Sequence, residues 1–273
     1  GAAATIAIVA TAPFKMQKGN KMLSEQYSRT AMLIGESGVA KLNKAHVAVF
    51  GVGGVGSWCA ESLVHTAIRH ITLVDCDCVN ETNLNRQLHA TTSTVGQRKV
   101  EAMRDRLLSI NPEADVVAID RVYCEETADE FNLNDYDYVI DAIDSLRDKI
   151  FLIRRATDST AVFFSSMGAA LKLDPTKVRV AEFWDVKGCP LGAALRKKFK
   201  KDKTYPKRKF KCVYSEELLE NKGEAPEVDG NSTWDVKKAQ INGSLVHITA
   251  IFGFTLSGLV VQDVENAIKN KDK

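Results

Sequence analysis

Short apolar runs alternate with amphipathic segments through most of the chain. The apolar runs predict strands at residues 46–51, 71–75, 115–119, 138–144 and 161–165, with a further candidate at 178–183. Apolar side chains at helical spacing predict helices over 22–42, 57–65, 99–110, 125–132 and 147–156. This alternation predicts an α/β protein with a doubly wound, mostly parallel Rossmann-like sheet, helices on both faces and a C-terminal α/β extension.

The strand at 46–51 runs directly into a glycine-rich loop. Gly51, Gly53 and Gly56 have G-x-G-x-x-G spacing, with Gly54 between them. Glycine is needed there because a Cβ would keep the backbone from closing on phosphate, whereas free N–H groups and the positive end of a helix attract the anion. The loop predicts a nucleotide site. It does not decide between a dinucleotide to be reduced and a triphosphate to be cleaved.

Two carboxylates are predicted at the same edge of the sheet as this loop. Asp75 ends the second strand nineteen residues after Gly56, where a carboxylate can accept hydrogen bonds from ribose hydroxyls. The alternative for Asp75 is an ordinary strand-end turn. Asp144 follows the apolar run that begins at Tyr138. Because ligands bind at the carboxyl ends of parallel strands, both side chains are candidates for the site.

The polar segment 77–90 bears on the choice between the two chemistries. A nicotinamide enzyme would leave this segment unexplained. An adenylating site must hold the β- and γ-phosphates with cations, place Mg²⁺ with a carboxylate and let a substrate carboxylate attack the α-phosphorus. The residue types present are those this reaction requires: Arg86 and Lys99 for charge, Asn83 for hydrogen bonds and Asp144 for the metal.

Composition places the chain among ordinary globular proteins. It has 273 residues, 45% of them hydrophobic and 26% charged, and a formal net charge of +2. A nearly neutral chain has no overall field for nucleic acid, so such contacts must come from local clusters. The six cysteines show no disulfide framework, which favours a reducing compartment, and we expect the cytoplasm. No C-x-x-C pair is present, so we expect no structural zinc.

One stretch is strongly basic. Ten of the sixteen residues in 196–211 are Lys or Arg. Such a run is commonly a solvated face, but Phe199, Tyr205 and Phe210 are interleaved with the charges and could stack on or anchor a polyanion. Both interpretations stay open at this point.

Five motifs in order resemble the E1-like adenylating family of ThiF, MoeB and HesA, which includes activators of ubiquitin-like and sulfur-carrier proteins. The motifs are Gly51-Val-Gly-Gly-Val-Gly56, Asp75-x-Asp77, Asn83-Leu-Asn-Arg86-Gln87, Gly96-Gln-Arg-Lys99-Val-Glu101 and Asp141-Ala-Ile-Asp144-Ser145. The resemblance implies an ATP site over the glycine loop (Gly51, Gly53, Gly54, Gly56), with Asp75 on the ribose and Asn83, Arg86 and Lys99 on the phosphates. Asp144 would carry Mg²⁺.

The resemblance also implies a second subunit. Arg29, in Tyr27-Ser28-Arg29, is similar to an arginine that reaches in trans into the ATP site of the neighbouring subunit, which predicts a homodimer. The alternative for Arg29 is a surface ion pair.

Within the family, the chain resembles the branch that dehydrates threonylcarbamoyladenosine in tRNA. This likeness covers Arg86-Gln-Leu-His89-Ala90, Leu173-Asp-Pro-Thr176 and Cys212-Val-Tyr-Ser-Glu216. It implies that the threonine carboxylate of N6-threonylcarbamoyladenosine 37 is adenylated and then cyclised with loss of water. The residues expected to bind tRNA are Arg196, Lys197, Lys198, Lys200, Lys201, Lys207, Arg208, Lys209 and Lys211.

The sequence leaves two roles open for one cysteine and for one histidine. Cys212 follows the basic run and could form a thioester if neighbouring cations activate it, or it could be an inert structural thiol. His89 could contact substrate or pack within its loop.

The expected organisation has four parts. Residues 1–21 form a tag or disordered extension, 22–185 the ATP-binding adenylation domain, 186–240 a basic and polar substrate-binding segment, and 241–273 a C-terminal helix on the core or a dimer interface. The apolar run 245–261 reaches the short limit of a membrane span. Its His247, hydroxyl residues and glycines favour a buried or interface helix.

Two alternatives to the tRNA enzyme are kept. One is an adenylating activator of a ubiquitin-like sulfur carrier, against which the missing C-x-x-C pairs count. The other is a non-enzymatic nucleotide-binding partner of a cysteine desulfurase system.

Overall fold

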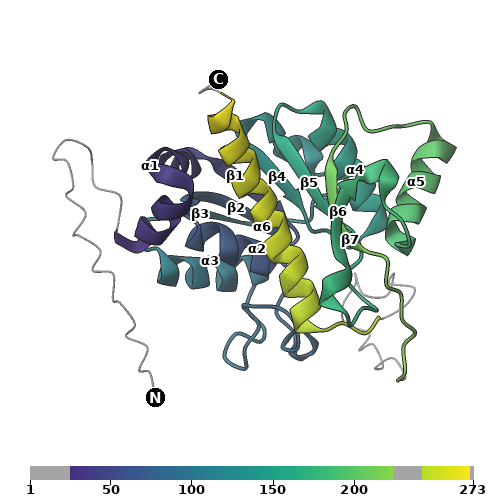
Figure 1. The fold of residues 1–273 in the computed structure, drawn as a ribbon. Coiled ribbons are helices and arrows are strands. Elements are labelled where there is room, and N and C mark those ends of the chain that lie inside the picture. The colour runs from purple at the N-terminus through teal and green to yellow at the C-terminus, as the bar shows by residue number, and fades with distance from the viewer. Residues whose placement is uncertain (1–24, 224–241, 271–273) are drawn as a thin grey trace, which may run out of the picture.

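Seven strands form one sheet in a computed structural model that describes residues 25–223 and 242–270. In space the strands follow the order β3-β2-β1-β4-β5-β7-β6 (Figure 1). All neighbours are parallel except β6, which runs antiparallel to β7. The strands are β1 His46–Phe50, β2 His70–Asp75, β3 Asp115–Asp120, β4 Tyr138–Asp141, β5 Val162–Ser166, β6 Val178–Glu182 and β7 Lys211–Ser215.

Helices cover both faces of this sheet. They are α1 Ser28–Lys44, α2 Gly56–His65, α3 Lys99–Ile110, α4 Leu146–Asp158, α5 Pro190–Asp202 and α6 Val246–Lys269. The helices α1, α2, α3 and α6 contribute to one hydrophobic cluster, and α4 and α5 to the other (Figure 1). The doubly wound, mostly parallel fold expected from the sequence is confirmed.

The central strand shows why the sequence folds this way. Val47 and Val49 belong to the first cluster, whereas Ala48 and Phe50 belong to the second. All four side chains are completely buried. A strand that is covered on both faces needs a continuous apolar run, and this one has it.

The strand order creates a crevice beside β1. The chain builds the sheet outward from β1 through β2 to β3 and then returns to add β4 on the other side of β1. Ligands of doubly wound sheets bind at this reversal point, outside the carboxyl ends of the strands. The residues that follow β1 and β4 are therefore expected to line the ligand site.

Local predictions fail where the sequence pattern is short. The helix predicted over 22–42 is interrupted at Gly35, where φ is +74°, whereas Gly38 stays inside α1. The helix expected over 125–132 is only a 3₁₀ turn at Ala128–Glu130. Strand β4 ends at Asp141, so 142–144 form a loop rather than strand.

Strand β7 was not anticipated from the sequence. It lies within the segment assigned to substrate binding, yet it pairs with both β5 and β6 in the main sheet. Its five residues follow a run of lysines, so no apolar pattern marked it. The expected extension at 1–21 and the polar loop over much of 220–240 lie outside the described residues.

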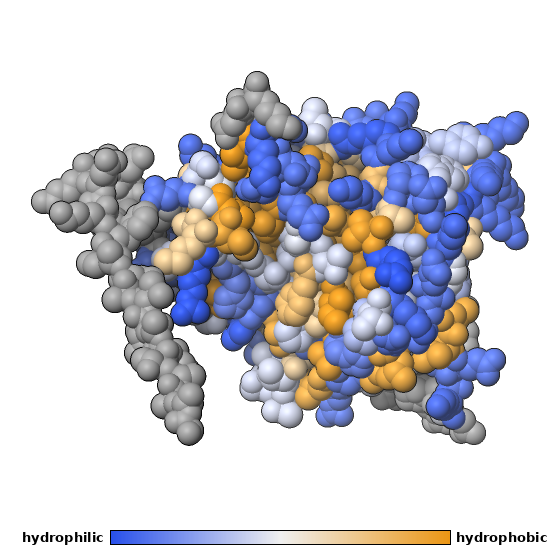
Figure 2. Space-filling view, viewed as in Figure 1, coloured by the Kyte–Doolittle hydropathy of each residue, from blue (hydrophilic) through white to orange (hydrophobic). Residues whose placement is uncertain are grey.

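Helix α6 packs along the first face of the sheet and against α2. A Cβ on Gly253 would lie 2.6 Å from Val55 O, so glycine allows the two helices to approach closely. Ser257 Oγ donates to Ser62 Oγ at 2.7 Å. By length and composition α6 could cross a membrane, but half of its apolar window is buried inside the protein. Figure 2 shows the apolar surface that remains along this helix, where Phe254 is 44% exposed.

Candidate nucleotide site

Two glycines after β1 are required by the protein's own backbone. Gly51 has φ +87°, and a Cβ there would lie 2.7 Å from Ala142 O in the loop after β4. A Cβ on Gly56 would lie 1.8 Å from Gly51 O. Because both residues are glycine, the backbone after β1 can approach the loop after β4 closely, and α2 can begin directly at the crevice.

The other two glycines face different surroundings. A Cβ on Gly54 would approach Thr249 Cγ2 to 3.2 Å and Arg86 Cγ to 3.3 Å. At Gly53 the nearest atom is Gln87 Nε2 at 3.9 Å, so no protein contact demands glycine. Only the end of the Gln87 side chain lies near Gly53, so an anion that displaces it can approach the N-terminus of α2.

Asp75 fixes the glycine loop to the end of β2. Its Oδ2 accepts a hydrogen bond from Val52 N at 2.7 Å and its Oδ1 accepts one from Asp77 N at 2.9 Å. Burial raises the pKa of this carboxyl, while Lys99 opposes the shift. Each carboxylate oxygen has a second lone pair, so Asp75 can hold the loop and still accept from ribose hydroxyls.

The first turn of α2 holds the polar segment 77–98 over the crevice. Trp58 Nε1 donates to Arg86 O at 3.1 Å, and Leu88 N donates to Ser57 Oγ at 3.2 Å. Arg86 is thereby placed beside the glycine loop, as its contact with the Gly54 position shows.

Arg86 and Asp144 form the charged rim of the crevice. A terminal guanidinium nitrogen of Arg86 donates to Thr82 O at 2.8 Å and to Asn85 Oδ1 at 2.9 Å. Burial lowers the pKa of Arg86, and the negative charge of Asp144 opposes that shift. Asp144 is exposed in the loop after β4. A cation and an anion from two separate loops thus interact beside the glycine loop.

Lys99 begins α3 at the far side of the same segment. The residue is buried, and its Nζ donates to Asp77 Oδ2 at 2.6 Å. Asn83 is also buried, and its Oδ1 accepts from Asn80 N at 3.1 Å. Asn83, Arg86 and Lys99, which were predicted to bind phosphates, therefore lie at one edge of the sheet, and Lys99 is held by Asp77.

Gln87 and His89 carry buried polar atoms that sequence reasoning did not resolve. Among the described residues, Gln87 Oε1 and both ring nitrogens of His89 have no hydrogen-bond partner. Burial lowers the pKa of His89 to about 4, and the charge of Lys99 adds to the shift, so the ring is neutral at pH 7. Buried polar groups in proteins are normally paired, so these atoms are suited to a bound molecule or water.

A buried ion pair supports the loop that carries Asp144. Lys149 Nζ lies 2.8 Å from Asp141 Oδ2, and both side chains are fully buried. The same Nζ donates to Ile143 O at 2.9 Å, and Ile143 N donates to Asp141 Oδ1 at 3.1 Å. No pattern in the sequence marks Lys149 as buried, because a lysine on a helix is normally a surface residue.

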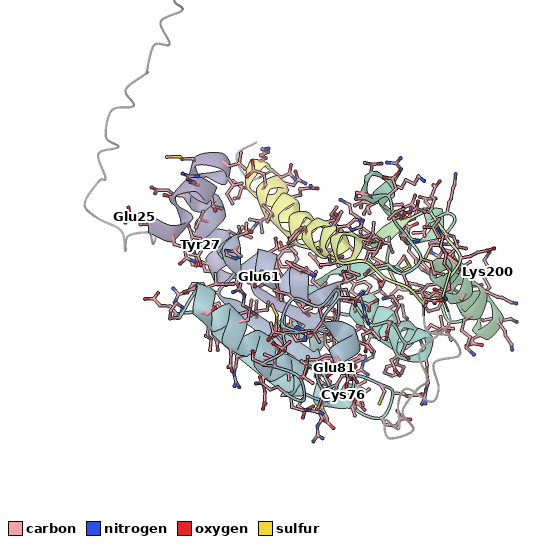
Figure 3. All side chains as sticks on the ribbon, turned by 90° about the horizontal axis from the view of Figure 1, so that it is seen from below. Glu25, Tyr27, Glu61, Cys76, Glu81 and Lys200 are labelled. Carbon is pink, nitrogen blue, oxygen red and sulfur yellow. The ribbon has the colours of Figure 1, made fainter. Side chains whose placement is uncertain are left out.

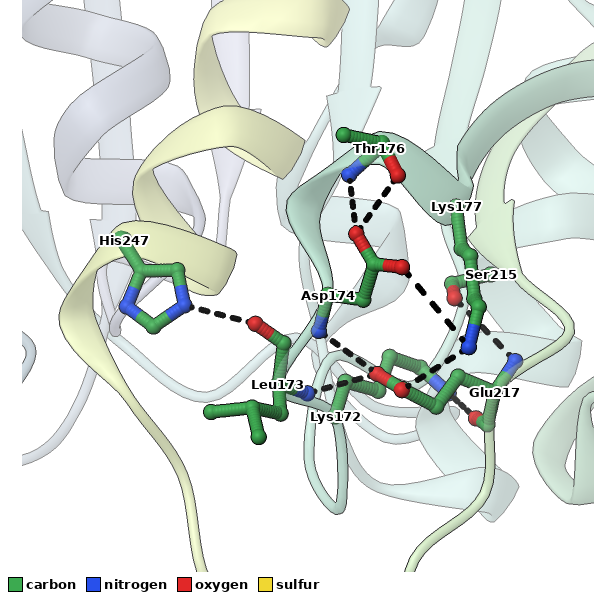
Figure 4. A network of polar contacts seen from close by, with 8 residues as sticks. All are labelled: Lys172, Leu173, Asp174, Thr176, Lys177, Ser215, Glu217 and His247. Atoms are coloured by element: carbon green, nitrogen blue, oxygen red, sulfur yellow. Dashed lines mark hydrogen bonds and ion pairs between the residues drawn. The ribbon is translucent and has the colours of Figure 1, made fainter.

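Three segments that meet beside α6 are joined by a polar cluster (Figure 4). Glu217 accepts hydrogen bonds from Leu173 N at 2.6 Å and Asp174 N at 2.9 Å, and its backbone carbonyl accepts from Lys172 Nζ. His247, which is exposed rather than part of the core, donates from Nε2 to Leu173 O at 2.9 Å. The cluster fixes the start of α6, where Thr249 also contacts the glycine loop.

The basic stretch lies apart from this crevice. In Figure 3 Lys200 on α5 is well separated from Cys76 and Glu81 at the crevice edge. Phe199 and Phe210 are buried core residues, so the expectation that they stack on a polyanion was wrong. The hydrophobic contacts of α5 and β7 with the sheet require them.

Two of the predicted basic residues also make internal contacts. Arg196 donates to Phe183 O at 3.2 Å, and Arg208 donates to Ala156 O at 3.0 Å and to Ala161 O. The remaining predicted tRNA contacts are exposed: Lys197, Lys198, Lys200, Lys201, Lys207, Lys209 and Lys211.

Arg29 is exposed on the first turn of α1. Among the described residues, none of its contacts is with the glycine loop, Arg86 or Asp144. Met32 and Leu33 follow it on α1 and are 84% and 86% exposed. Large apolar side chains that are this open are typical of an interaction surface.

Cys212 lies in β7 with its side chain completely buried. Burial raises the pKa of its thiol well above the ordinary value, and Lys149 only partly opposes the shift. This position argues against the cation-activated thiolate considered from the sequence, because the neighbouring lysines of the basic run do not reach the thiol.

We expect Cys212→Ala to keep catalytic activity within about twofold of the wild type, because a buried thiol with a raised pKa supplies little thiolate at neutral pH. The activity measured is the one proposed below. A hundredfold loss in a variant that keeps the native circular dichroism spectrum would contradict this expectation.

A glycine loop at the reversal point of a doubly wound sheet, flanked by Arg86, Lys99 and Asp144, defines an α/β nucleotide-binding protein of the E1-like adenylating class. The chain belongs to the ThiF family, whose sequence model matches residues 27–265.

Named relatives refine this assignment. The chain is 39% identical over 249 residues to the tRNA threonylcarbamoyladenosine dehydratase of Bacillus subtilis, covering 90% of this chain and 97% of that protein. The crystal structure of Escherichia coli tRNA N6-threonylcarbamoyladenosine dehydratase, TcdA, in complex with ATP superposes with a TM-score of 0.78 and 33% identity. That match covers 90% of this chain and 96% of the other.

A relative with a different name matches only in part. The adenylyltransferase and sulfurtransferase MOCS3 of Culex quinquefasciatus is 38% identical over 129 residues, which cover 46% of this chain and 29% of that protein.

Proposed function

We propose that this chain is an ATP-dependent dehydratase that adenylates the threonine carboxylate of N6-threonylcarbamoyladenosine 37 in tRNA and cyclises it. The observation that carries the proposal is that Arg86 lies beside Gly54 with the charge of Asp144 acting on it, while Lys99 acts on Asp75, the carboxylate that bonds to the glycine loop. Near full-length similarity to dehydratases of this name supports the substrate.

The chemistry proceeds in two balanced steps. A carboxylate oxygen of the threonyl group attacks the α-phosphorus of ATP, and pyrophosphate leaves. A nucleophilic group within the modification then attacks the activated carboxyl carbon, and AMP leaves with that oxygen. ATP is converted to AMP and pyrophosphate, and the nucleoside loses the elements of water.

The cationic side chains are suited to the first step. Arg86 is fixed through its backbone by Trp58 and lies beside Gly54, where it can neutralise phosphate charge that builds up on the leaving group. Lys99 reaches the phosphates only if its ammonium leaves Asp77. The Lys99–Asp77 pair would hold the lysine in place until a phosphate competes for it.

Mg²⁺ fits the acidic residue on the rim. Asp144 presents an exposed carboxylate opposite Arg86, and Mg²⁺ on nucleotides is commonly held by one or two carboxylates together with phosphate oxygens. When bound, the ion supplies charge neutralisation and polarises phosphoryl oxygens. Asp144 would position it beside the phosphates.

The second step needs no enzyme nucleophile. The attacking group and the activated carboxyl belong to the same modification, so proximity is already provided. The burial of Cys212 agrees with such a route. The protein's remaining task is to keep water from the acyl adenylate.

Mass spectrometry of the tRNA nucleosides tests the function. Incubation with ATP, Mg²⁺ and tRNA carrying threonylcarbamoyladenosine is expected to lower the mass of that nucleoside by one water. An unchanged mass would refute the proposal. Pyrophosphate exchange that depends on a small protein ending in Gly-Gly would select the sulfur-carrier activator, and ATP binding without pyrophosphate release would select a non-enzymatic role.

A homodimer completes the proposed site. Arg29 does not reach the crevice of its own chain among the described residues, and it precedes the exposed Met32 and Leu33 on α1. We propose that α1 packs on a second copy and that Arg29 enters the partner's ATP site.

Subunit mixing tests the role in trans. Arg29→Ala and Asp144→Asn are each expected to be inactive alone, whereas co-expressed mixed dimers contain one site with both native residues. Recovery of about a quarter of wild-type activity is expected if half of the dimers are mixed and each has one working site. No recovery on mixing, with mixed dimers present by mass, would contradict the role of Arg29 in trans.

The same proposal places the protein in the cytoplasm. A tRNA substrate is made and modified there, and all six cysteines are free. A cysteine desulfurase partner stays a prediction from the sequence.

A further inference from the structure

A cavity of about 650 Å³ opens at the edge of the sheet opposite the nucleotide crevice. It lies between the C-terminal half of α4 and the loop that follows α5. Its lining consists of Phe151, Arg154, Arg155, Asp158, Lys203, Thr204, Tyr205, Pro206 and Lys207. Only Lys207 of this set was among the residues predicted to bind tRNA.

The loop that closes the cavity is held in one conformation. Lys203 ends α5 with φ +53°, and Thr204 N donates to Phe199 O at 3.1 Å. Lys207 N donates to Thr157 Oγ1 at 3.1 Å, and the guanidinium of Arg208 bonds to Ala156 O at the end of α4. These bonds use the backbone of Thr204 and Lys207 and the side chain of Arg208, and the side chains of Lys203 and Lys207 are exposed to solvent.

The lining is positively charged on balance. Arg154, Lys203 and Lys207 form no ion pair among the described residues. Arg155 is 3.1 Å from Asp129, and Asp158 supplies a negative charge to the lining. Unpaired like charges held near one another repel, so an anion bound among them gains more than it would at an isolated lysine.

An aromatic ring stands at the rim of the same cavity. Tyr205 is 52% exposed, and its ring centroid lies 6.1 Å from that of Trp184, which supports it from one side. An exposed aromatic ring beside cations can stack on one base of an unpaired nucleic-acid strand while the cations contact the neighbouring phosphates.

We propose that this cavity is a second tRNA site, in which Arg154, Lys203 and Lys207 contact backbone phosphates and one unpaired base stacks on Tyr205. The inference rests on the proposed function. Helix α4 begins beside Asp144 and ends at the cavity, and its thirteen residues span about 20 Å. The cavity is therefore too far from the glycine loop to hold the adenosine being modified, and it binds another part of the tRNA.

Binding of wild type and variants to unlabelled ATP and to labelled, modified tRNA tests the site. Arg154→Gln/Lys203→Asn is expected to weaken tRNA binding about tenfold and to reduce the slope of log Kd against log salt by about 1 to 2, because two phosphate contacts are lost. Asn is chosen because it tolerates the left-handed conformation at 203. ATP affinity is expected to stay within twofold.

Matched variants separate stacking and local charge from general effects. Tyr205→Ala is expected to weaken tRNA binding about tenfold, whereas Tyr205→Phe keeps the ring and is expected to bind as the wild type does. Arg104→Gln/Arg121→Gln removes the same charge from α3 and the loop after β3, outside the cavity, and is expected to leave the affinity unchanged.

Three results would overturn the inference. They are an equal loss in the Arg104→Gln/Arg121→Gln control, unchanged tRNA affinity in both Arg154→Gln/Lys203→Asn and Tyr205→Ala, and ATP binding that depends on Tyr205, which would make the cavity a mononucleotide site. A wild-type protein that binds tRNA without dehydrating it would instead refute the proposed function and leave the cavity result interpretable.

Discussion

Replacing Asp144 by Asn is expected to lower pyrophosphate release and ring closure about a thousandfold while the fold stays intact. The substitution keeps the shape of an exposed side chain and removes its charge. That charge acts on Arg86, which lies beside the glycine loop, and is the proposed anchor for Mg²⁺. Without it, the cations of the crevice and the phosphates lose the group that organises them. Pyrophosphate release with modified tRNA, followed across Mg²⁺ concentrations, measures the loss.

A neighbouring acid provides the control. Asp148 lies in the first turn of α4, and Asp148→Asn makes the same chemical change at an acid with no proposed role in the site. It is expected to retain wild-type rates. If Asp144→Asn still released pyrophosphate within tenfold of the wild type and with the same Mg²⁺ dependence, Asp144 would not be the metal-binding residue.

The parts of the fold that could be predicted are those with a repeating pattern. The buried run of β1 and the glycine spacing after it indicated the sheet and its ligand-binding edge. The motifs around Arg86, Lys99 and Asp144 indicated adenylation, and the structure places these residues at that edge. Such features follow from local sequence, because a strand covered on two faces and a loop that approaches phosphate each restrict residue type.

The parts that could not be predicted depend on tertiary burial. Phe199 and Phe210 stand among lysines in the sequence, yet the fold turns both rings into the core and leaves Tyr205 as the exposed aromatic residue. The sequence left Cys212 open between a thiol activated by neighbouring cations and an inert one, and β7 buries it within the sheet. Lysines close to Cys212 in sequence therefore do not surround its side chain, because β7 turns that side chain into the sheet while the lysines stay on the surface.

Lys149 of α4 is the clearest example of such burial, because it is a lysine with no exposure to water. Lys149→Met is expected to destabilise the protein by about 3–5 kcal/mol, because Asp141 would be left as an unpaired charge with no exposure to water. Urea unfolding followed by circular dichroism measures the change. Asp141→Asn added to Lys149→Met removes that charge while its side-chain carbonyl can still accept from Ile143 N. The double variant is therefore expected to recover more than half of the lost stability.

Activity distinguishes the catalytic support of this pair from its contribution to stability. Lys149 also donates to Ile143 O, one residue before Asp144, so the pair fixes the loop that presents the carboxylate proposed to bind the metal. At a temperature where the double variant is fully folded, it is expected to stay at least about tenfold slower than the wild type, because a displaced catalytic group costs rate even when the fold is intact. A double variant that regained both stability and full activity would show that the buried pair serves the fold alone. One no more stable than Lys149→Met would show that the uncompensated charge of Asp141 is not the source of the destabilisation.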